Sequence, residues 1–491
     1  MGCQLKENLT IRRIFVTLQY NVPVFSHNRA LVLGVLLALL TTVLGPVFFT
    51  GYNDLMAARS ALADGRDSDA AHLYESAARK LLWRKDLWEK AGLAAYRSGD
   101  NENSIRLLGI ARREDSLSVQ GWITLGTLNW MDHEISSAIS IWRSGLQAFP
   151  DSKALYDQLI MAYHDQNEFT DEQAALTKRL ALGEDAVMHY RLGLLLTISN
   201  FQLARVQFNA SSSLDPEFKS VTTTLLSALD AAESETDPAR QLVIIGRGLG
   251  LVGEWGLASS AFEHAVDFDG KNAEAWAWLG EARQHQGQDG GQELAKALNL
   301  DPGNPIVHAL QGLYWKRQGN YSKELGEYQK AAQIEPENPA WQISMGEAYT
   351  LNGDLVSALA AYQKATILSP ANAEYWRLLA VFCTDNDVQV MEIGLPAAQK
   401  AFELAPADPQ VLDALGLSYL HAGYLYNAEQ NLIKAVKIDP AFAKAHIHLG
   451  EAYLQKGDRT SAFNELMLAR QLDPNGSTGQ LAGRLLEQYF P

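Results

Sequence analysis

The chain contains 491 residues, with a formal net charge of −16 and 47% hydrophobic residues. This composition is typical of a folded acidic protein and excludes a disordered chain. Because a nucleic-acid binder needs basic residues against the phosphates, the acidity also argues against nucleic acid as a partner. The two cysteines, Cys3 and Cys383, are too few and too far apart for a disulfide framework or a metal-binding motif.

Residues 30–50 form the most apolar segment of the chain and follow a leading tail at residues 1–29. Residues 30–49 contain no charged side chain, and a helix of that length spans about 30 Å, the thickness of the hydrocarbon core of a bilayer. A cleavable signal peptide is the alternative, but its apolar stretch is shorter and ends in small residues. We therefore predict an uncleaved transmembrane anchor helix over residues 30–50.

The charges around this segment indicate its orientation. The basic residues ahead of it outnumber the single acidic residue, Glu7, and are Lys6, Arg12, Arg13 and Arg29. The positive-inside tendency predicts a single-pass membrane protein with a cytoplasmic N-terminus and an extracytoplasmic region after the anchor. Met1, Gly2 and Cys3 are similar to a lipid-attachment signal, but Lys6 replaces the Ser or Thr of that motif.

From residue 51 onward the sequence repeats with a period of 34 residues. Residues 409–442 are the clearest copy, and residues 339–372 and 443–476 repeat the same pattern. The pattern consists of apolar, small and turn-forming residues, which in the clearest copy are Leu412, Leu415, Gly416, Tyr419, Gly423, Ala428, Leu432, Ala435 and Pro440. It resembles the tetratricopeptide repeat, in which each unit is a pair of antiparallel helices.

Extending this register gives twelve units, whose residues we number by position from 1 to 34. The units begin at Gly51, Lys85, Val119, Lys153, Ala186, Ala239, Ala273, Pro305, Pro339, Ala373, Pro409 and Ala443. Nine of the twelve residues at position 8 are glycine, although glycine inside a helix costs about 0.5–1 kcal/mol relative to alanine. This points to a steric demand where the two helices approach. The resemblance implies an all-α fold, a right-handed superhelix of about twelve helix pairs behind the transmembrane helix.

The register divides the chain after the anchor into two blocks. We predict a first block of five units at residues 51–218 and a second block of seven units at residues 239–476. Residues 219–238 fall outside the register and are predicted to form a spacer or an extra helix. Residues 477–491 are predicted to form a capping helix over the last unit.

Patterns that would indicate catalysis or cofactor binding are weak. Gly248, Gly250 and Gly253 match a dinucleotide fingerprint, but that motif needs a preceding strand and here lies within a predicted helix. His446 and His448 are two residues apart on a helix, so they cannot share a metal ion. No triad or carboxylate pair is apparent, and too little sequence lies outside the units to form a catalytic domain. We expect no enzymatic activity, cofactor or metal.

The resemblance to tetratricopeptide proteins implies a non-catalytic interaction scaffold, or an assembly or chaperone factor. Similar anchored proteins at bacterial membranes suggest a membrane tether and a bacterial type. The partner segment is expected in a concave groove formed by positions 2, 5, 9, 12 and 13 of the first helices. The alternative hypothesis is an accessory subunit of a complex for cell-envelope glycan synthesis, export or secretion.

In the last six units the groove positions carry more acidic than basic side chains, with apolar residues between them. The predicted groove residues are Glu274, Glu281, Leu313, Lys316, Arg317, Ile343, Glu347, Glu374, Arg377, Asp385, Asp413, Leu417, Ile447 and Glu451. Such a surface suits a protein or peptide partner with apolar segments flanked by basic residues. The alternative is that these acids are only the solvated surface of an acidic protein.

Overall fold

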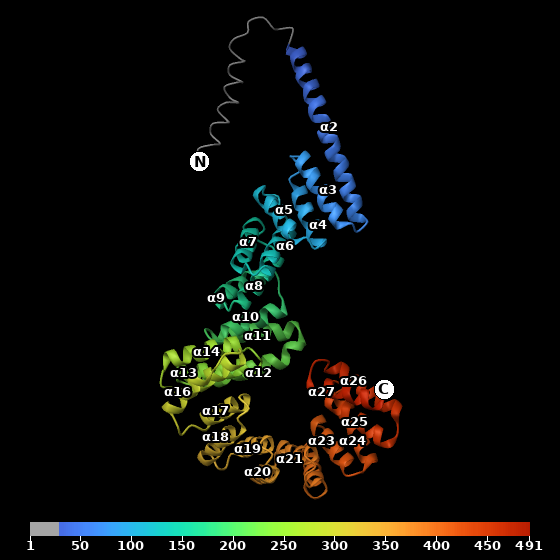
Figure 1. Ribbon diagram of the computed structural model, residues 1–491. Coiled ribbons are helices and arrows are strands. Elements are labelled where there is room, and N and C mark those ends of the chain that lie inside the picture. Colours follow the sequence, from blue (N-terminus) through green and yellow to red (C-terminus); the bar gives the residue numbers. More distant parts are fainter. Residues whose placement is uncertain (1–28) are drawn as a thin grey trace. The chain divides into compact units, whose positions relative to one another are not determined.

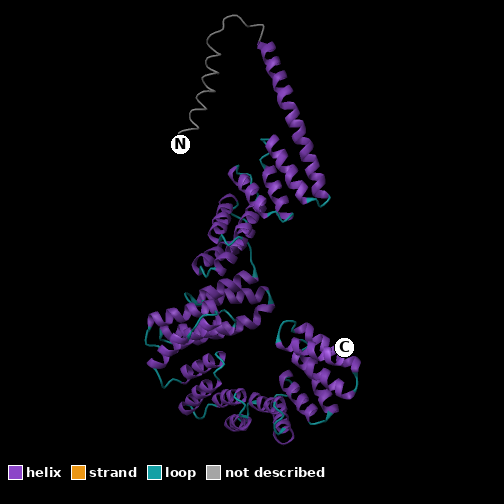
Figure 2. Ribbon diagram, viewed as in Figure 1, coloured by secondary structure: helices purple, strands orange, loops and turns teal. Residues whose placement is uncertain are grey.

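The structure is a computed structural model that describes residues 29–491 (Figure 1). Within these residues there are 26 α-helices, one short 3-10 helix (Pro216–Phe218) and one π-helical turn (Val390–Gly394), and no strand (Figure 2). The predicted all-α fold is therefore confirmed for this part of the chain.

The described chain forms two compact units, and each is described separately. Unit 1 contains the residues up to 195 together with residues 206–216, and unit 2 contains residues 196–205 and 217–491. The helices of unit 1 are α2 (Arg29–Ala63), α3 (Asp67–Lys80), α4 (Asp86–Arg97), α5 (Asn101–Arg113), α6 (Val119–Met131), α7 (Ile135–Ala148), α8 (Lys153–Asp165), α9 (Phe169–Ala181), α10 (Ala186–Leu196) and most of α11 (Phe201–Leu214).

Unit 2 holds the helices in which the groove was predicted. They are α12 (Lys219–Ser234), α13 (Pro238–Leu251), α14 (Trp255–Phe268), α15 (Ala273–His285), α16 (Gly291–Leu300), α17 (Pro305–Arg317), α18 (Tyr321–Ile334), α19 (Pro339–Leu351), α20 (Leu355–Leu368), α21 (Ala373–Asp385), α22 (Leu395–Leu404), α23 (Pro409–His421), α24 (Leu425–Ile438), α25 (Ala443–Lys456), α26 (Arg459–Leu472) and α27 (Ser477–Tyr489). In this order, α13 and every second helix up to α25 are the first helices of successive pairs.

The predicted membrane anchor is part of a longer helix, α2, which continues as far as Ala63. The last turns of α2 pack against α3 and bury Leu55, Ala58 and Ala61. In residues 29–491 no helix is both long enough and apolar enough to cross a membrane. The predicted localisation, a single-pass membrane protein with an extracytoplasmic repeat array, is therefore wrong for this part of the chain. The apolar run instead continues, without a break in the helix, into the end of α2 that packs on α3. Apart from Arg29, the predicted cytoplasmic tail and its lipid-attachment signal lie outside the described residues.

Six of the seven first helices of unit 2 begin in the same way, with a side chain that caps the backbone; the exception is α25, whose N-cap is Phe442. The oxygen of an Asn or Asp at the N-cap accepts a hydrogen bond from an N–H group in the first turn, at Asp237, Asn272, Asn304, Asn338, Asn372 and Asp408. Such caps satisfy donors that the helix itself leaves unpaired. The turn from first to second helix uses glycine with positive φ, as at Gly353 (78°) and Gly423 (79°). Local sequence therefore accounts for where these helices begin and end.

In the pairs that carry glycine at position 8, the two helices approach so closely that an added side chain would collide with the second helix. A Cβ atom on Gly416 would lie 2.5 Å from Cγ of Leu432, and one on Gly246 would lie 2.4 Å from the ring of Phe262. Both distances are well inside van der Waals contact. The glycines are therefore required by the packing of the second helix against the first.

Ring nitrogens at position 4 hold each first helix to the turn that precedes it. In four pairs the ring N–H donates to the backbone carbonyl six residues earlier: Trp276 to Gly270 (3.0 Å), His308 to Pro302 (2.9 Å), Trp376 to Pro370 (2.9 Å) and His446 to Pro440 (3.1 Å). A tryptophan or a histidine at position 4 thus satisfies a carbonyl that ends the previous unit.

Candidate partner-binding surface

The predicted groove residues all lie on first helices of unit 2. Glu274 and Glu281 are on α15; Leu313, Lys316 and Arg317 on α17; Ile343 and Glu347 on α19; Glu374, Arg377 and Asp385 on α21; Asp413 and Leu417 on α23; Ile447 and Glu451 on α25. Three of the apolar members, Ile343, Leu417 and Ile447, are buried, so they serve mainly to pack one repeat against the next.

Several of the charged groove residues form ion pairs between consecutive first helices. Arg317 donates from Nη1 to Oε2 of Glu281 (2.7 Å) and from Nη2 to Oε1 (2.5 Å), and Glu281 is only 3% exposed. This bidentate bond outweighs the effect of burial and raises the pKa of Arg317. From the same helix, Lys316 donates to Glu347 on α19 (3.2 Å). These contacts join α15, α17 and α19.

His448, a buried histidine, pairs with Asp413, one of the predicted groove residues. The sequence analysis gave this histidine no role. His448 on α25 lies 2.7 Å, through Nδ1, from Oδ1 of Asp413 on α23, and both side chains are buried. Burial disfavours the charged imidazole, but the charge of Asp413 and its hydrogen bond outweigh it, so the pKa of His448 is raised. The signal for this pair is the 35-residue spacing, one repeat plus one residue, which places two side chains side by side on neighbouring first helices.

Pairing within the chain leaves few free acids along these helices. Arg377 donates to both carboxylate oxygens of Glu374 on the same helix, each at 2.6 Å. Among the predicted groove acids, only Asp385 and Glu451 lack an ion pair in the described structure, and burial raises the pKa of Glu451. The structure therefore joins most of the predicted acidic residues to bases of the same chain.

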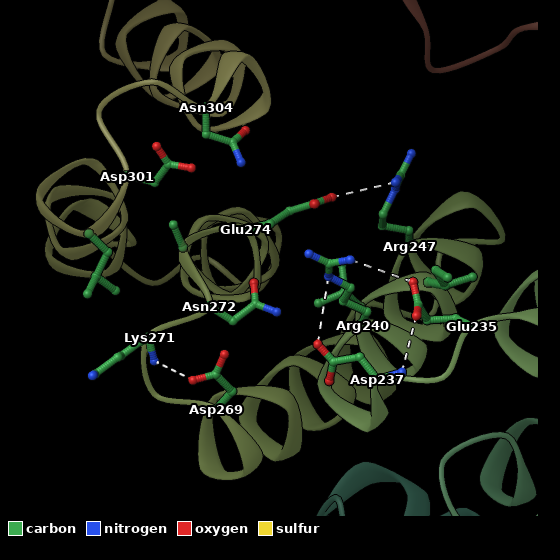
Figure 3. Close-up of a pocket in the computed structure, with 14 residues that line it drawn as sticks. Glu235, Asp237, Arg240, Arg247, Asp269, Lys271, Asn272, Glu274, Asp301 and Asn304 are labelled. Atoms are coloured by element: carbon green, nitrogen blue, oxygen red, sulfur yellow. Dashed lines mark hydrogen bonds and ion pairs between the residues drawn. The ribbon is translucent and has the colours of Figure 1, made fainter.

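A cavity lies at α13, at the start of α15 and at the turn before α17, and its polar lining includes the solvent-exposed side chains of Asp269 and Asp301 (Figure 3). Its volume is about 560 Å³. The lining residues come from the first helices α13 and α15, from the last residue of α16, and from the turns before α13, α15 and α17: Glu235, Asp237, Arg240, Val243, Ile244, Arg247, Asp269, Lys271, Asn272, Ala273, Glu274, Leu300, Asp301 and Asn304. Glu274 is the one predicted groove residue in this set.

The floor of the cavity consists of two copies of one turn, Asp-x-x-Asn. Asn272 and Asn304 use their Oδ1 atoms to cap α15 and α17. Asp269 and Asp301 each accept a backbone N–H two residues later through Oδ1, from Lys271 and Gly303 (both 3.0 Å). The second oxygen of each aspartate and the Nδ2 group of each asparagine have no hydrogen bond within residues 29–491.

The arginines of the cavity are held loosely. Arg247 lies 3.6 Å from Glu274, and Arg240 lies 3.7 Å from Asp237 and 4.0 Å from Glu235. These separations are too long for hydrogen bonds, unlike the tight bond of Arg317. The sequence analysis missed four residues of the cavity: Arg240, Arg247, Lys271 and Asn304. The predicted groove starts at residue 273, and the repeat pattern gives the turn residues no role other than to end a helix. Asp-x-x-Asn recurring before successive first helices was the available signal.

Other kinds of site find little support in the described part of the chain. No group of three or more His, Cys, Asp or Glu side chains is placed to hold a metal ion there. Gly248 and Gly250, from the dinucleotide-like pattern, lie within α13, where a Cβ would contact Ala228 and Trp255 respectively. Helix packing therefore accounts for both glycines.

Comparison with known proteins gives the family of the repeats. Models of the tetratricopeptide repeat match residues 317–381, 409–442 and 443–475, and neither matching model describes a catalytic family. Over 112 residues the chain is 33% identical to the cellulose synthase operon protein C of Escherichia coli (strain K12) and to the putative protein of that name from E. coli O157:H7. This similarity covers 23% of the chain and only 9% of the length of those relatives.

Solved structures to which the chain is similar include Cut9 with Hcn1 from an APC/C hetero-tetramer and yeast Tom70. The first is 13% identical and the second 14%; each covers 92% of this chain, and 99% and 96% of its own chain, with a TM-score of 0.41 for both. MamA from Desulfovibrio magneticus RS-1 is 24% identical over 35% of this chain and 97% of its own, with a TM-score of 0.31. From its helix pairs and the matched family models, the chain is a protein that contains tetratricopeptide repeats, at residues 317–381 and 409–475.

Proposed function

We propose that the chain is a non-catalytic scaffold that binds a segment of another protein on the first helices of unit 2. The observation that carries this proposal is the cavity at α13, α15 and α17, where hydrogen-bonding groups have no partner within the described chain. Tetratricopeptide helix pairs form a rigid support, so a surface of this kind is already shaped before the partner arrives. Such preorganisation lowers the entropic cost of binding.

Site-specific cross-linking in cells tests this proposal. A photo-reactive amino acid replaces Leu300, which is 38% exposed and lines the cavity, and in a control chain it replaces Ile367 on α20, which is 75% exposed and lies outside it. We expect mass spectrometry to identify a protein that is linked from position 300 and not from position 367. If position 300 links to no protein, or both positions link to the same set, the proposal is wrong.

A second candidate function rests on the similarity to cellulose synthase operon protein C. Under this alternative, the chain is an accessory subunit of a complex that makes or exports a cell-envelope glycan, and the scaffold positions its enzymes. The same cross-linking experiment separates the two. Proteins of glycan polymerisation or export among the linked products support the second candidate, whereas folding or assembly factors support the first.

A further inference from the structure

We propose that the cavity binds an extended, basic segment of the partner protein. In this arrangement, Asn272 and Asn304 hydrogen-bond the partner's main chain, while Asp269 and Asp301 hold its lysine or arginine side chains. The proposal deepens the scaffold function and rests on it. It differs from the groove prediction because it places the partner at the turns before the first helices.

The first argument is that the two turns offer donors and acceptors in pairs. Each cap fixes its asparagine by Oδ1, which leaves the Nδ2 group as a donor, and each aspartate keeps one free oxygen as an acceptor. Figure 3 shows Asp301 and Asn304 on one turn, and Asp269 and Asn272 on the neighbouring one, around the same cavity. A polypeptide main chain also alternates donors and acceptors, so it can use such pairs.

The next turn along the chain shows that these groups are not open in every repeat. There the acid is Glu335, and its longer side chain accepts hydrogen bonds through Oε2 from Nδ2 of Asn338 (2.9 Å) and from Nε1 of Trp341 (2.8 Å). The donor of that asparagine and the oxygen of that acid are therefore used within the turn. In the cavity the shorter aspartates do not make this bond, so donor and acceptor remain available to a ligand.

Charge selects a basic segment over an acidic one. The cavity is lined by the carboxylates of Glu235, Asp237, Asp269, Glu274 and Asp301, against Arg240, Arg247 and Lys271. Arg240 and Arg247 lie beside three of these acids, and the side chain of Lys271 extends away from Asn272 (Figure 3). Asp269 and Asp301 have no ion pair in the described chain, so the remaining field favours a cation.

The lining also favours a peptide over a sugar. None of the fourteen lining residues is aromatic, so a sugar ring would find no flat surface on which to stack. The apolar residues Val243, Ile244 and Leu300 can instead contact the stem of a lysine or arginine side chain.

Binding of synthetic peptides to the full-length chain tests the proposal. The probes are three fluorescein-labelled twelve-residue peptides with blocked ends, identical except that four positions are all lysine, all glutamate or all glutamine, together with labelled cellohexaose. We expect the lysine peptide to bind about tenfold more tightly than the glutamate peptide, with the glutamine peptide between them and weak or no binding of cellohexaose. Added salt should weaken binding of the lysine peptide.

A charge-removing double variant, D269N/D301N, tests the site itself. Asparagine keeps the Oδ1 acceptor on which each turn depends, so the fold should be retained. The matched control is D408N/D439N, because Asp408 and Asp439 accept backbone N–H groups at equivalent turns outside the cavity. We expect D269N/D301N to weaken the lysine peptide about tenfold and the control to change its affinity less than about twofold. If the double variant unfolds by circular dichroism, the single variant D301N supplies the same test with about half the effect on the free energy.

Some outcomes would overturn this inference alone. They are equal binding of the glutamate and lysine peptides, tighter binding of cellohexaose than of any peptide, or equal effects of the two double variants. If, at the same time, position 300 cross-links to a partner protein, the scaffold function stands and only the assigned chemistry fails. If nothing is cross-linked and no probe binds, both proposals fail.

Discussion

Single residues in this array show where a repeat departs from its own pattern. Glu324 on α18 occupies the position of close approach to the first helix, where other units have Ala258, Ala358, Ala428 or Ala462. Its side chain is fully buried, and neither carboxylate oxygen has a hydrogen-bond partner in the described structure. Burial is the main cause that raises the pKa of Glu324. A buried carboxyl without a partner is unfavourable in its charged form.

We predict that E324Q stabilises the α17–α18 pair near neutral pH and has little effect in acid. Above the ordinary pKa of glutamate the unfolded chain ionises while the folded chain keeps its proton. Stability is therefore lost as pH rises from that ordinary value to the raised one. E324Q removes this titration, so it should recover the stability that the wild type loses as pH rises. Hydrogen exchange of the α18 amides, at neutral and at acidic pH, measures the change in stability. The control variant is E337Q, because Glu337 is exposed. Equal effects of E324Q at both pH values would contradict the burial argument.

The His448–Asp413 pair makes a pH-dependent contribution to the stability of the fold, because the pKa of His448 is raised. Because the pKa of His448 is raised, its contribution to stability is present below the ordinary pKa of histidine and lost as pH rises through the raised value. We predict that the imidazole of His448 titrates above the ordinary pKa of histidine, and that D413N lowers its midpoint. Nuclear magnetic resonance of the ring protons measures the midpoint in the wild type and in the variant. An unchanged His448 midpoint in D413N would show that the aspartate does not hold the charge.

At the scale of elements, most helix pairs are held together by contact between a glycine of the first helix and a large side chain of the second. The glycine at position 8 faces Leu432 from Gly416, Leu466 from Gly450 and Tyr362 from Gly346. The close approach is therefore preserved from pair to pair while the residue that fills it varies. Glycines outside this position have other surroundings, and a Cβ added to Gly326 on α18 would have no atom within 4 Å.

This contrast predicts that replacing glycine by alanine has opposite effects on the free energy of unfolding at Gly416 and at Gly326. In G416A the new methyl group meets Cγ of Leu432 at 2.5 Å, so we expect a loss of about 1–3 kcal/mol. In G326A the methyl group enters open space within a helix, so we expect a gain of up to about 1 kcal/mol. Urea unfolding followed by circular dichroism compares the two variants. If both substitutions stabilised the chain, the result would contradict the close packing of α23 against α24 at Gly416.

At the scale of the whole molecule, each helix packs mainly on its neighbours in sequence. In unit 2, α12 packs on α13, and the chain continues pair by pair to α27, which packs on α26 and α25. The helix α12 occupies most of the segment predicted as a spacer. The division into a five-unit and a seven-unit block stays a prediction. In an array of this kind a destabilising substitution affects mainly its own repeat and the adjacent ones, because a repeat contacts only the repeats beside it.

We therefore predict that the loosening caused by G416A stays local. Hydrogen exchange should accelerate in α23, α24 and the adjacent helices α22 and α25, and remain unchanged in α3 to α9 of unit 1. Wild-type chain under the same conditions is the reference for each peptide. Uniform acceleration along the chain would contradict a nearest-neighbour array and would indicate one cooperative core.

The sequence by itself determined the helical class, the 34-residue period and the residues that start and end the helices. These features are local: a capping Asn, a turn glycine and a glycine at position 8 act within one unit. Tertiary structure decided which charges meet: a spacing near one repeat places residues on neighbouring first helices, but the structure selects Arg317 for Glu281 (36 residues apart) and His448 for Asp413 (35 residues apart). It also decided which polar groups have no partner within the chain, since the cavity combines turns from three successive repeats. The length of α2 likewise follows from packing, because its end is held by α3 rather than by the apolarity of its beginning. Periodicity predicts the face on which a side chain lies, whereas the rotation of one unit on the next decides its partner.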